Sequence, residues 1–281
     1  MLYFIHIHRT GGTTLKAIFR NNFGLKTLFI NNNNRANYEY NLDEYHNLFK
    51  ICKFFNYKVL ESHNLRYPPT GSNNLNIKLE PITFLRDPME RFLSNYFYLQ
   101  QIAGKNHYAN SDFDRYVEFI KKNHPHDVRY LNGEVLQIAK EYNLEKAKSI
   151  IDQFYFVGLT EYFDQSLILL QNKIGRKYFN INYEKKNVGK VKQIKKRYYD
   201  EIKESGTYYK VKMEMNLDIE LYKYVKEKLL KEIDEFDGEF NNELKKYKSL
   251  NTNYKFPLFK TKVNNLFSRI VTELLKKKYK F

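Results

Sequence analysis

The sequence has almost no cysteine and no long apolar run. Cys52 is the single cysteine among 281 residues, so no internal disulfide can form and a metal site made of cysteines is excluded. Proteins without disulfides are typical of reducing compartments. No uninterrupted apolar stretch reaches the about 20 residues that a membrane-spanning helix needs, and the first residues already predict a strand instead of a targeting segment. We therefore expect a cytoplasmic protein without a transmembrane segment.

Acidic residues are also few relative to basic ones. The chain has 32 Asp and Glu against 48 Lys and Arg, a formal net charge of +16, which predicts attraction to acidic glycans, nucleic acids, phosphorylated cofactors or an anionic membrane surface. The alternative is that dispersed lysines only reflect a general composition bias. The apolar fraction of 42% and the aromatic fraction of 17% exclude a disordered chain. We expect one large folded α/β domain or two small ones.

The first two dozen residues predict a strand, a tight loop and a helix. Residues 2–7 form an aromatic and β-branched run that breaks at residues 9–12, and apolar residues resume at helical spacing from Leu15 to Phe19. Two glycines allow the backbone to approach a ligand closely, and the amides of the loop and first helical turn then point at it. This arrangement predicts a site for a phosphate or sulfate group. The expected binding residues are Arg9, Thr10, Gly11, Gly12, Thr13 and Thr14.

The loop lacks two residues of the commonest phosphate-binding motif. A P-loop NTPase has a glycine, four residues and then Gly-Lys-Ser/Thr, whereas residues 11–14 provide neither the leading glycine nor the lysine. This argues against a nucleotide triphosphatase, and a nucleotide or small-molecule kinase with an atypical loop is kept as an alternative. By itself a Gly-Gly turn is only moderately specific, because such turns also simply connect a strand to a helix.

A second cluster of polar residues follows the clearest strand in the middle of the chain. The apolar run from Pro81 leads into Arg86, and Asp87-Pro88 provides an N-cap and a first-turn proline for the next helix. Arg86 at the strand end and Ser94 about two turns along the helix can converge on one more phosphate, because ligands of open α/β sheets bind beyond the strand carboxyl ends. Two anion sites predict a bis-phosphorylated ligand. The alternative is an ion pair for Arg86 and an ordinary helical serine.

Strands and helices alternate along most of the chain, which predicts an α/β fold with a parallel sheet covered on both faces. Further strands are expected at residues 57–63 and 154–158, and helices at 38–55, 88–99, 113–123, 128–138, 144–154 and from 160. Beyond residue 189 the chain becomes Lys-rich and helical, with Leu217, Leu221, Val225 and Leu229 on one face. No internal repeat is present.

We place a domain boundary near residues 245–253, which gives a main domain of residues 1–245 and a basic helical extension of residues 246–281. Apolar residues from Val263 to Leu274 recur at three- and four-residue steps and are followed by the Lys-rich end of the chain. The pattern favours a helix docked on the domain. A helix that binds a membrane surface or a partner is the alternative.

Two segments together resemble a known family. Residues 4–15 are similar to the 5′-phosphosulfate loop, and residues 84–98 to the 3′-phosphate motif, of sulfotransferases that use 3′-phosphoadenosine 5′-phosphosulfate (PAPS). The similarity is greatest to the carbohydrate branch that includes heparan sulfate 2-O-sulfotransferase and the bacterial sulfotransferase family 2, and it covers residues 1 to about 190. Weaker similarities lie at residues 131–133, 156–167 and 187–189.

The resemblance implies a function and a set of binding residues. It implies a P-loop-like three-layer fold in which Arg9 to Thr14 bind the 5′-phosphosulfate and Arg86 and Ser94 bind the 3′-phosphate. The reaction would transfer a sulfuryl group to a hydroxyl of a carbohydrate or glycan, which the basic charge allows to be acidic, and release adenosine 3′,5′-bisphosphate (PAP) without a metal. Nucleic acid is not the expected partner. A polyanion-binding module without catalysis is the alternative from another class of protein.

One position departs from the family pattern. The family usually has Pro-Lys where this chain has His8-Arg9, and the lysine is thought to stabilise or protonate the leaving phosphate. An arginine stays charged and does not donate a proton in proteins. Arg9 is therefore expected to act in catalysis through its charge and its planar set of donors.

A base for the acceptor hydroxyl is expected among the histidines, because histidine titrates nearest to neutral pH. His63 ends the strand from residue 57 and stands where the family has a Gly-His pair, so it is the predicted base, and Glu61 is the reserve. His6 and His8 are expected to support the loop. For the remaining candidates, a structural ion pair is expected for Arg91 and Arg66, a weak cofactor contact for Asn132 and Asn187, and a solvated surface position for His107, His124 and His126.

Overall fold

The computed structural model describes residues 1–30, 37–70, 77–102, 111–175, 179–184, 192–236 and 238–256, together with residues 266, 270 and 273; for residues 192–197 it describes the backbone only. Its elements are β1 (Leu2–Ile5), α1 (Gly12–Phe23), η1 (Gly24–Lys26), β2 (Thr27–Phe29), α2 (Leu42–Phe54), β3 (Val59–Ser62), β4 (Glu80–Leu85), α3 (Pro88–Ile102), α4 (Phe113–Asn123), α5 (Gly133–Ala139), α6 (Leu144–Ile151), β5 (Phe156–Leu159), α7 (Phe163–Ile174), α8 (Lys192–Glu204), α9 (Gly206–Glu214), α10 (Asn216–Asp234) and α11 (Phe240–Asn251).

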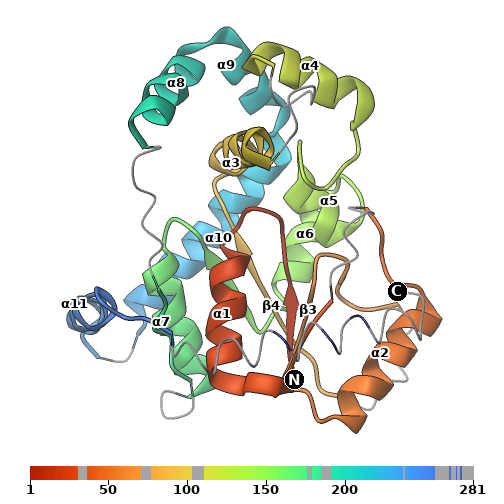
Figure 1. Ribbon diagram of the computed structural model, residues 1–281, viewed down its shortest axis with the longest axis vertical. Helices are drawn as coiled ribbons and strands as arrows, with labels where there is room; N and C mark the ends of the chain where they lie inside the picture. The colour runs from red at the N-terminus through yellow and green to blue at the C-terminus, as the bar shows by residue number, and fades with distance from the viewer. Residues whose placement is uncertain are drawn as a thin grey trace.

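A five-stranded parallel sheet forms the middle layer (Figure 1). The strand order is β2-β3-β1-β4-β5, so β1 is the central strand. Phe4 pairs with Glu61 of β3 on one side and with Ile82 of β4 on the other. All four residues of β1 are buried, as expected for a parallel strand covered on both faces. The predicted α/β fold with a central parallel sheet between helices is confirmed.

The two faces of β1 enter different hydrophobic clusters. Phe4 packs with residues of α1 such as Leu15, whereas Tyr3 packs with residues of α2 such as Phe49. A third cluster joins α3, α4, α8 and α9, which lie together beyond the carboxyl ends of the strands, at the top of Figure 1. Strand alternation sends successive side chains to opposite faces, and this explains the three layers.

Two local predictions differ from the structure. The strand β2 was not predicted, because its three residues follow η1 directly and are too short for a period-two pattern. The helix expected from residue 128 begins only at Gly133. Residues 127–132 form turns instead, with Asn132 in the left-handed region at φ 48°, so the apolar residues Val128 and Tyr130 reach the core from turns.

Helix α11 crosses the predicted domain boundary. It runs without interruption over residues 245 and 246, and the Tyr247 hydroxyl donates to the Ile181 carbonyl at 3.0 Å. The helix therefore connects the two predicted parts, and the division stays a prediction. The amphipathic pattern of residues 263–274 lies almost wholly outside the described residues. Among the helices that are described, none is both long and apolar enough to cross a membrane.

Candidate functional site

The predicted site residues follow three neighbouring strands. The loop of residues 6–11 follows β1, His63 follows β3, and Arg86 follows β4. Because β1 lies between β3 and β4 and all three strands are parallel, their carboxyl ends meet at one edge of the sheet. The topology therefore brings the loop, the predicted base and the predicted 3′-phosphate residue together at the edge where α/β proteins bind ligands.

The loop after β1 presents an open helix end. Arg9 and Gly11 adopt left-handed conformations at φ 67° and 84°, and helix α1 then begins at Gly12 with no side-chain cap and no acidic residue in its first turn. The Thr14 amide bonds to the Gly11 carbonyl at 3.0 Å, but the first-turn amides of Gly12 and Thr13 have no partner within the helix. They are consequently available to an anion, which the helix dipole also favours.

The loop threonines differ in their surroundings. Thr13 is exposed and Thr14 half-buried, so both can meet a ligand. The Thr10 side chain is buried, and its hydroxyl donates to the Ile7 carbonyl at 2.9 Å. Thr10 therefore stabilises the turn with its side chain, and its backbone amide is the group that can face a ligand.

Gly12 is required by the close approach of His6. A Cβ atom at position 12 would lie 1.9 Å from Nε2 of His6. The histidine cannot simply move away, because its Nδ1 is 2.5 Å from Oε1 of the buried Glu61. The glycine thus lets the helix start directly above the His6 ring.

Replacing Gly12 by alanine is expected to destabilise the protein by about 1–3 kcal/mol through overpacking. The measurement is the midpoint of thermal unfolding by calorimetry, which is expected to fall. Gly206→Ala is the matched control, because a Cβ atom at Gly206 would meet nothing within 4 Å, and its midpoint is expected to stay the same or rise. Equal midpoints for the Gly12→Ala variant and the unmodified protein would contradict the packing argument.

The two predicted anion-binding clusters contact each other through Arg9. Its Nε donates to Oγ of Ser94 at 3.1 Å, and its carbonyl accepts a hydrogen bond from Nη1 of Arg86 at 3.2 Å. The guanidinium also lies 4.5 Å from the centre of the Tyr98 ring. Arg86 also makes a long ion pair with Glu161, at 3.8 Å. It therefore has the acidic partner that the alternative interpretation expected.

Among the described residues, no acidic side chain neutralises the positive charge of Arg9. In the part of the chain that the structure describes, no carboxylate lies within 4.0 Å of the Arg9 guanidinium. Burial, and then the neighbouring Arg86, lower the pKa of Arg9. Both causes reflect the cost of holding an unpaired cation out of water beside another cation. A bound anion would relieve this cost.

Three histidine rings pack against one another at the loop, and His63 is the middle one: its ring is stacked on that of His8 and tilted by 31° to that of His6. The His63 ring lies 4.0 Å from the His6 ring and 3.8 Å from the His8 ring, measured between ring centres. Nδ1 of His63 is 2.6 Å from the His6 carbonyl oxygen. A carbonyl oxygen only accepts, so Nδ1 carries the proton and Nε2 is the ring nitrogen that can accept one.

Burial disfavours the charged forms of His63 and His8. It lowers the pKa of His63 to about 3, with a further contribution from His6. Burial also lowers the pKa of His8, and His63 adds to that effect. Desolvation disfavours a charged imidazole, so His63 is in the form that a general base requires throughout the neutral range.

Glu61, the reserve base, is inaccessible to a substrate. Its side chain is fully buried, with Oε1 at His6 and Oε2 at 3.1 Å from Nζ of Lys16. Burial alone would raise the pKa of Glu61, but Lys16 and His6 together lower it to about 2. The carboxylate is therefore ionised and lies between the His6 ring and the Lys16 ammonium inside the protein.

The trio His6, Glu61 and His63 also has the residue types of a metal site. One potential ligand atom from each lies within 4.8 Å of the others. The chemistry of the donors fits a metal poorly, because the two Glu61 oxygens already face the His6 ring and the Lys16 ammonium, and a dication would have to replace that ammonium. The expectation of a site without a metal stays a prediction.

Arg91 forms the structural ion pair that was predicted. It is fully buried and lies 3.1 Å from Asp218 and 3.6 Å from Glu134. Oε1 of Glu134 also accepts the backbone N–H of Arg86 at 3.1 Å. Burial raises the pKa of Glu134 and of Asp218 against the effect of Arg91. The cluster connects α3, α5 and α10 directly behind the Arg86 loop and so supports its position.

The remaining candidates have mainly structural contacts. Arg66 was expected to form an ion pair, but its guanidinium donates to the carbonyls of His63 and Leu65. Asn132 bridges two backbone groups, because it donates to the Glu214 carbonyl and accepts the Asp218 N–H. His124 and His126 lie in the turns before α5, at or near the surface. His107 and Asn187 lie outside the described residues.

Sequence reasoning missed several residues that surround the site. Tyr98 and Glu161 contact the two arginines, Lys16 pairs with Glu61, and Gln137 donates to the His63 carbonyl at 3.2 Å. Lys16 and Tyr98 had a usable signal, since each lies one helical turn from a predicted binding residue. Glu161 and Gln137 come from distant elements, and no local pattern marks them.

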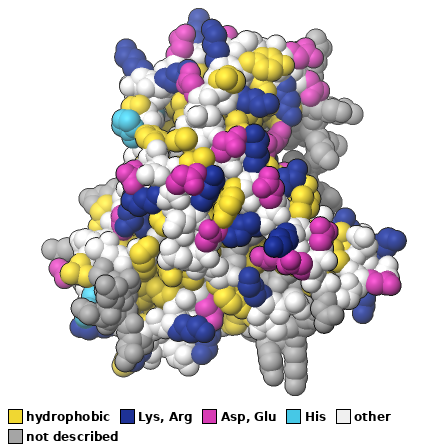
Figure 2. All heavy atoms as spheres, turned by 180° about the vertical axis from the view of Figure 1, so that it is seen from behind, with side chains coloured by type: hydrophobic (Ala, Val, Ile, Leu, Met, Phe, Trp, Pro, Cys, Tyr) yellow, Lys and Arg dark blue, Asp and Glu magenta, His cyan; other side chains and the backbone are white. Residues whose placement is uncertain are grey.

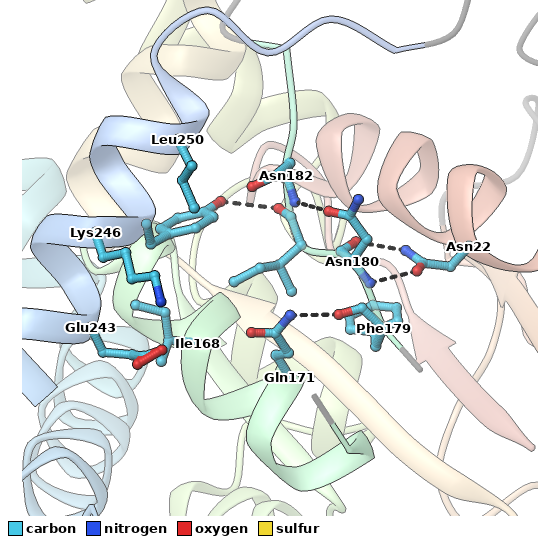
Figure 3. A pocket seen from close by; sticks show the side chains of 11 residues that line it. Asn22, Ile168, Gln171, Phe179, Asn180, Asn182, Glu243, Lys246 and Leu250 are labelled. Carbon is cyan, nitrogen blue, oxygen red and sulfur yellow. Dashed lines mark hydrogen bonds between the residues drawn. The ribbon is translucent and has the colours of Figure 1, made fainter. Parts of the chain in front are cut away.

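A polar cavity of about 410 Å³ lies away from the strand ends. Figure 3 shows it between the end of α1, the middle of α7 and α11. Its amide groups are occupied by backbone groups: Asn22 exchanges two hydrogen bonds with Asn180, and Gln171 donates to the Phe179 carbonyl. These contacts hold residues 179–182 against the helices, which gives the amides a structural role.

The surface charges are mixed in the view from behind. Figure 2 shows lysine and arginine side chains interspersed with acidic ones, so the described part of this face carries no continuous basic surface. A polyanion-binding module would require such a surface. The charge pattern on this face therefore does not favour the non-catalytic alternative.

Comparison with known protein families gives a match over most of the chain. The search of curated proteins finds no significant match. The sequence model of the Sulfotransferase family matches residues 1–225, which include the loop after β1, the predicted base and both arginines, and extend beyond the about 190 residues in which the resemblance was noted. The chain therefore belongs to the Sulfotransferase family.

Proposed function

We propose that this sulfotransferase moves a sulfuryl group from PAPS to a hydroxyl group of a carbohydrate or glycan. The observation that carries the proposal is the contact between the two anion-binding clusters: Arg9 bonds to Ser94, and Arg86 bonds to the Arg9 carbonyl. Two anion sites joined in this way suit a donor with a phosphosulfate and a separate phosphate. The proposed base His63 follows the adjacent strand β3, so the acceptor is expected on that side of the loop.

The binding roles follow from the charges and donors. The open amides of α1, with Arg9, Thr13 and Thr14, would hold the 5′-phosphosulfate, and Arg86 with Ser94 would hold the 3′-phosphate. Arg9 touches Ser94, so its guanidinium lies between the two groups. It stays charged throughout the reaction, and it stabilises the negative charge that grows on the leaving phosphate in the transition state.

The chemistry at the acceptor needs one proton transfer. When bound, the donor provides an electrophilic sulfur, whose bond to the phosphate oxygen breaks as its bond to the acceptor oxygen forms, and PAP is released. Nε2 of His63 takes the acceptor proton, because Nδ1 is already protonated and bonded to the His6 carbonyl. The proton is then released to solvent, and His63 returns to its neutral form.

Discrimination between nucleotides tests the 3′-phosphate assignment. PAP is expected to bind about 10²–10⁴-fold more tightly than adenosine 5′-phosphate, because Arg86 and Ser94 would both bond to the 3′-phosphate and each hydrogen bond to a charged group contributes about 1.5–3 kcal/mol. Isothermal titration calorimetry with the two nucleotides measures this ratio. In an Arg86→Met, Ser94→Ala double variant the ratio is expected to fall to near one, whereas Arg115→Met, at an exposed arginine of α4, keeps it. Equal affinities in the unmodified protein would refute the assignment.

The acceptor class is tested separately. Purified protein is incubated with PAPS labelled in the sulfate group and a panel of glycans, and the products are read by mass spectrometry. Sulfated glycan is the expected product, and ATP with magnesium is not expected to replace PAPS as the donor. Transfer of phosphate from ATP would favour the kinase alternative, and transfer only to non-carbohydrate hydroxyls would correct the acceptor class.

A further inference from the structure

A buried group of charges lies behind the proposed base and takes no direct part in the proposed reaction. Glu61 is fully buried on β3, two residues before His63. It contacts the Lys16 ammonium at 3.1 Å and the His6 ring at 2.5 Å. A buried carboxylate is costly even when it is paired, and an apolar side chain would commonly serve a core equally well. The position of the carboxylate therefore requires an explanation.

The buried carboxylate is connected to His63 in two ways. The first is through His6, whose ring bonds to Glu61 while its backbone carbonyl accepts the Nδ1 proton of His63 at 2.6 Å. The second is through space, because an oxygen of Glu61 lies within 4.8 Å of a ring nitrogen of His63. Both connections act in a region closed to water, where charges interact strongly.

We propose that Glu61, acting through His6, is a positioning residue for His63: it holds the ring with Nε2 toward the acceptor and balances the positive charge that His63 gains. This inference rests on the proposed function of His63 as the base. Glu61 touches neither substrate nor the reacting atoms, and Lys16 serves to keep it ionised.

The proton balance of the step requires no further group. The acceptor proton moves to Nε2 of His63, the Nδ1 proton stays bonded to the His6 carbonyl, and Glu61 remains ionised. The charged groups that face His63 are Glu61 from β3 and Lys16 from α1, with the titratable rings of His6 and His8 on either side. Glu61 favours the imidazolium and Lys16 opposes it. Of these two effects on the pKa of His63, that of Glu61 is the larger.

Glu61→Gln is the direct test, because it removes the charge and keeps the shape. We expect kcat to fall about tenfold while the KM for PAPS changes less than about twofold, as for loss of a group that acts only in the transition state. We also expect the Nδ1 proton of His63, observed by NMR of ¹⁵N-histidine-labelled protein, to exchange with solvent at least about tenfold faster, because the ring is held less firmly. Glu80→Gln, in β4 at the opposite end of the sheet, is the matched control and should change neither quantity.

The exchange measurement separates this inference from the proposed function. If the unmodified protein transfers no sulfuryl group, the function is wrong, yet the exchange rate of the His63 proton still reports the role of Glu61. Unchanged exchange in a folded Glu61→Gln variant would overturn the inference, and so would an unchanged kcat in an active enzyme.

Lys16→Met provides a second variant in case Glu61→Gln does not fold. Lys16 lowers the pKa of Glu61, so without it the carboxylate takes up a proton at a higher pH. At pH 7 we expect kcat and proton exchange within about twofold of the unmodified values, and a loss of activity on acidification that begins at higher pH than in the unmodified enzyme. The inference would be overturned if the Lys16→Met variant lost activity on acidification over the same pH range as the unmodified enzyme.

Discussion

Replacement of His63 by alanine is expected to lower kcat by about 10²–10⁴-fold, the usual contribution of a general base. Nδ1 of His63 is bonded to the His6 carbonyl, so only Nε2 of this ring can accept the acceptor proton. Steady-state rates with PAPS and a glycan acceptor measure the effect. PAP affinity, measured by calorimetry, is expected to stay within about twofold, because the anion-binding residues are left in place.

A histidine outside the site provides the control for this result. His46 is exposed on α2, and His46→Ala is expected to retain full activity. Turnover within tenfold of the unmodified enzyme for His63→Ala would move the base to another residue, and His8 would be the next candidate because its ring stacks directly on His63. A parallel loss of PAP binding would instead assign His63 to the architecture of the loop.

Replacement of Arg9 by methionine is expected to lower kcat/KM by about 10²–10³-fold, the usual effect of losing one donor that stabilises a growing negative charge. Arg9 is half-buried, contacts Ser94 at 3.1 Å, and lies at the point where the two anion clusters meet. Its loss removes a charge from both the ground state and the transition state, so both PAP affinity and kcat should fall. Calorimetry and single-turnover rates separate the two contributions.

Arg9→Lys distinguishes charge from geometry at this position. A lysine keeps the positive charge but lacks the planar set of donors that bonds Ser94. If Arg9 acts mainly through its charge, the lysine variant is expected within about tenfold of the unmodified activity. An Arg9→Met variant as active as the unmodified enzyme would exclude the electrostatic role, and a lysine variant more active than the unmodified enzyme would show that proton donation to the leaving phosphate limits the reaction.

Local patterns were sufficient for most of the elements. The period of the apolar residues predicted α4 at residues 113–123, where the structure has it, and the Asp87-Pro88 pair marked the start of α3. Patterns failed where an element is too short to have a period, as for β2. They also failed where apolar residues enter the core from turns, as before α5.

The candidate site was predictable where its residues directly follow a strand. Residue type and position after a strand marked Arg9, His63 and Arg86, because parallel strands bring their carboxyl ends to one edge. No local pattern predicted which groups the side chains of the site contact. Thr10 was expected as a ligand donor and turned out to bond within its own turn, and Glu61 was expected as a reserve base and is closed off by Lys16 and His6.

The sequence by itself determined the strand, loop and helix at the start of the chain, the order of the two anion motifs, and the family to which the chain belongs. These depend on neighbouring residues, whose spacing is preserved whatever the rest of the chain does. Only the tertiary structure decided that Arg9 bonds to Ser94, 85 residues away, and that His63 carries its proton on Nδ1. Both depend on the register of β1 against β3 and β4, which is set by packing across the whole sheet and not by any local pattern.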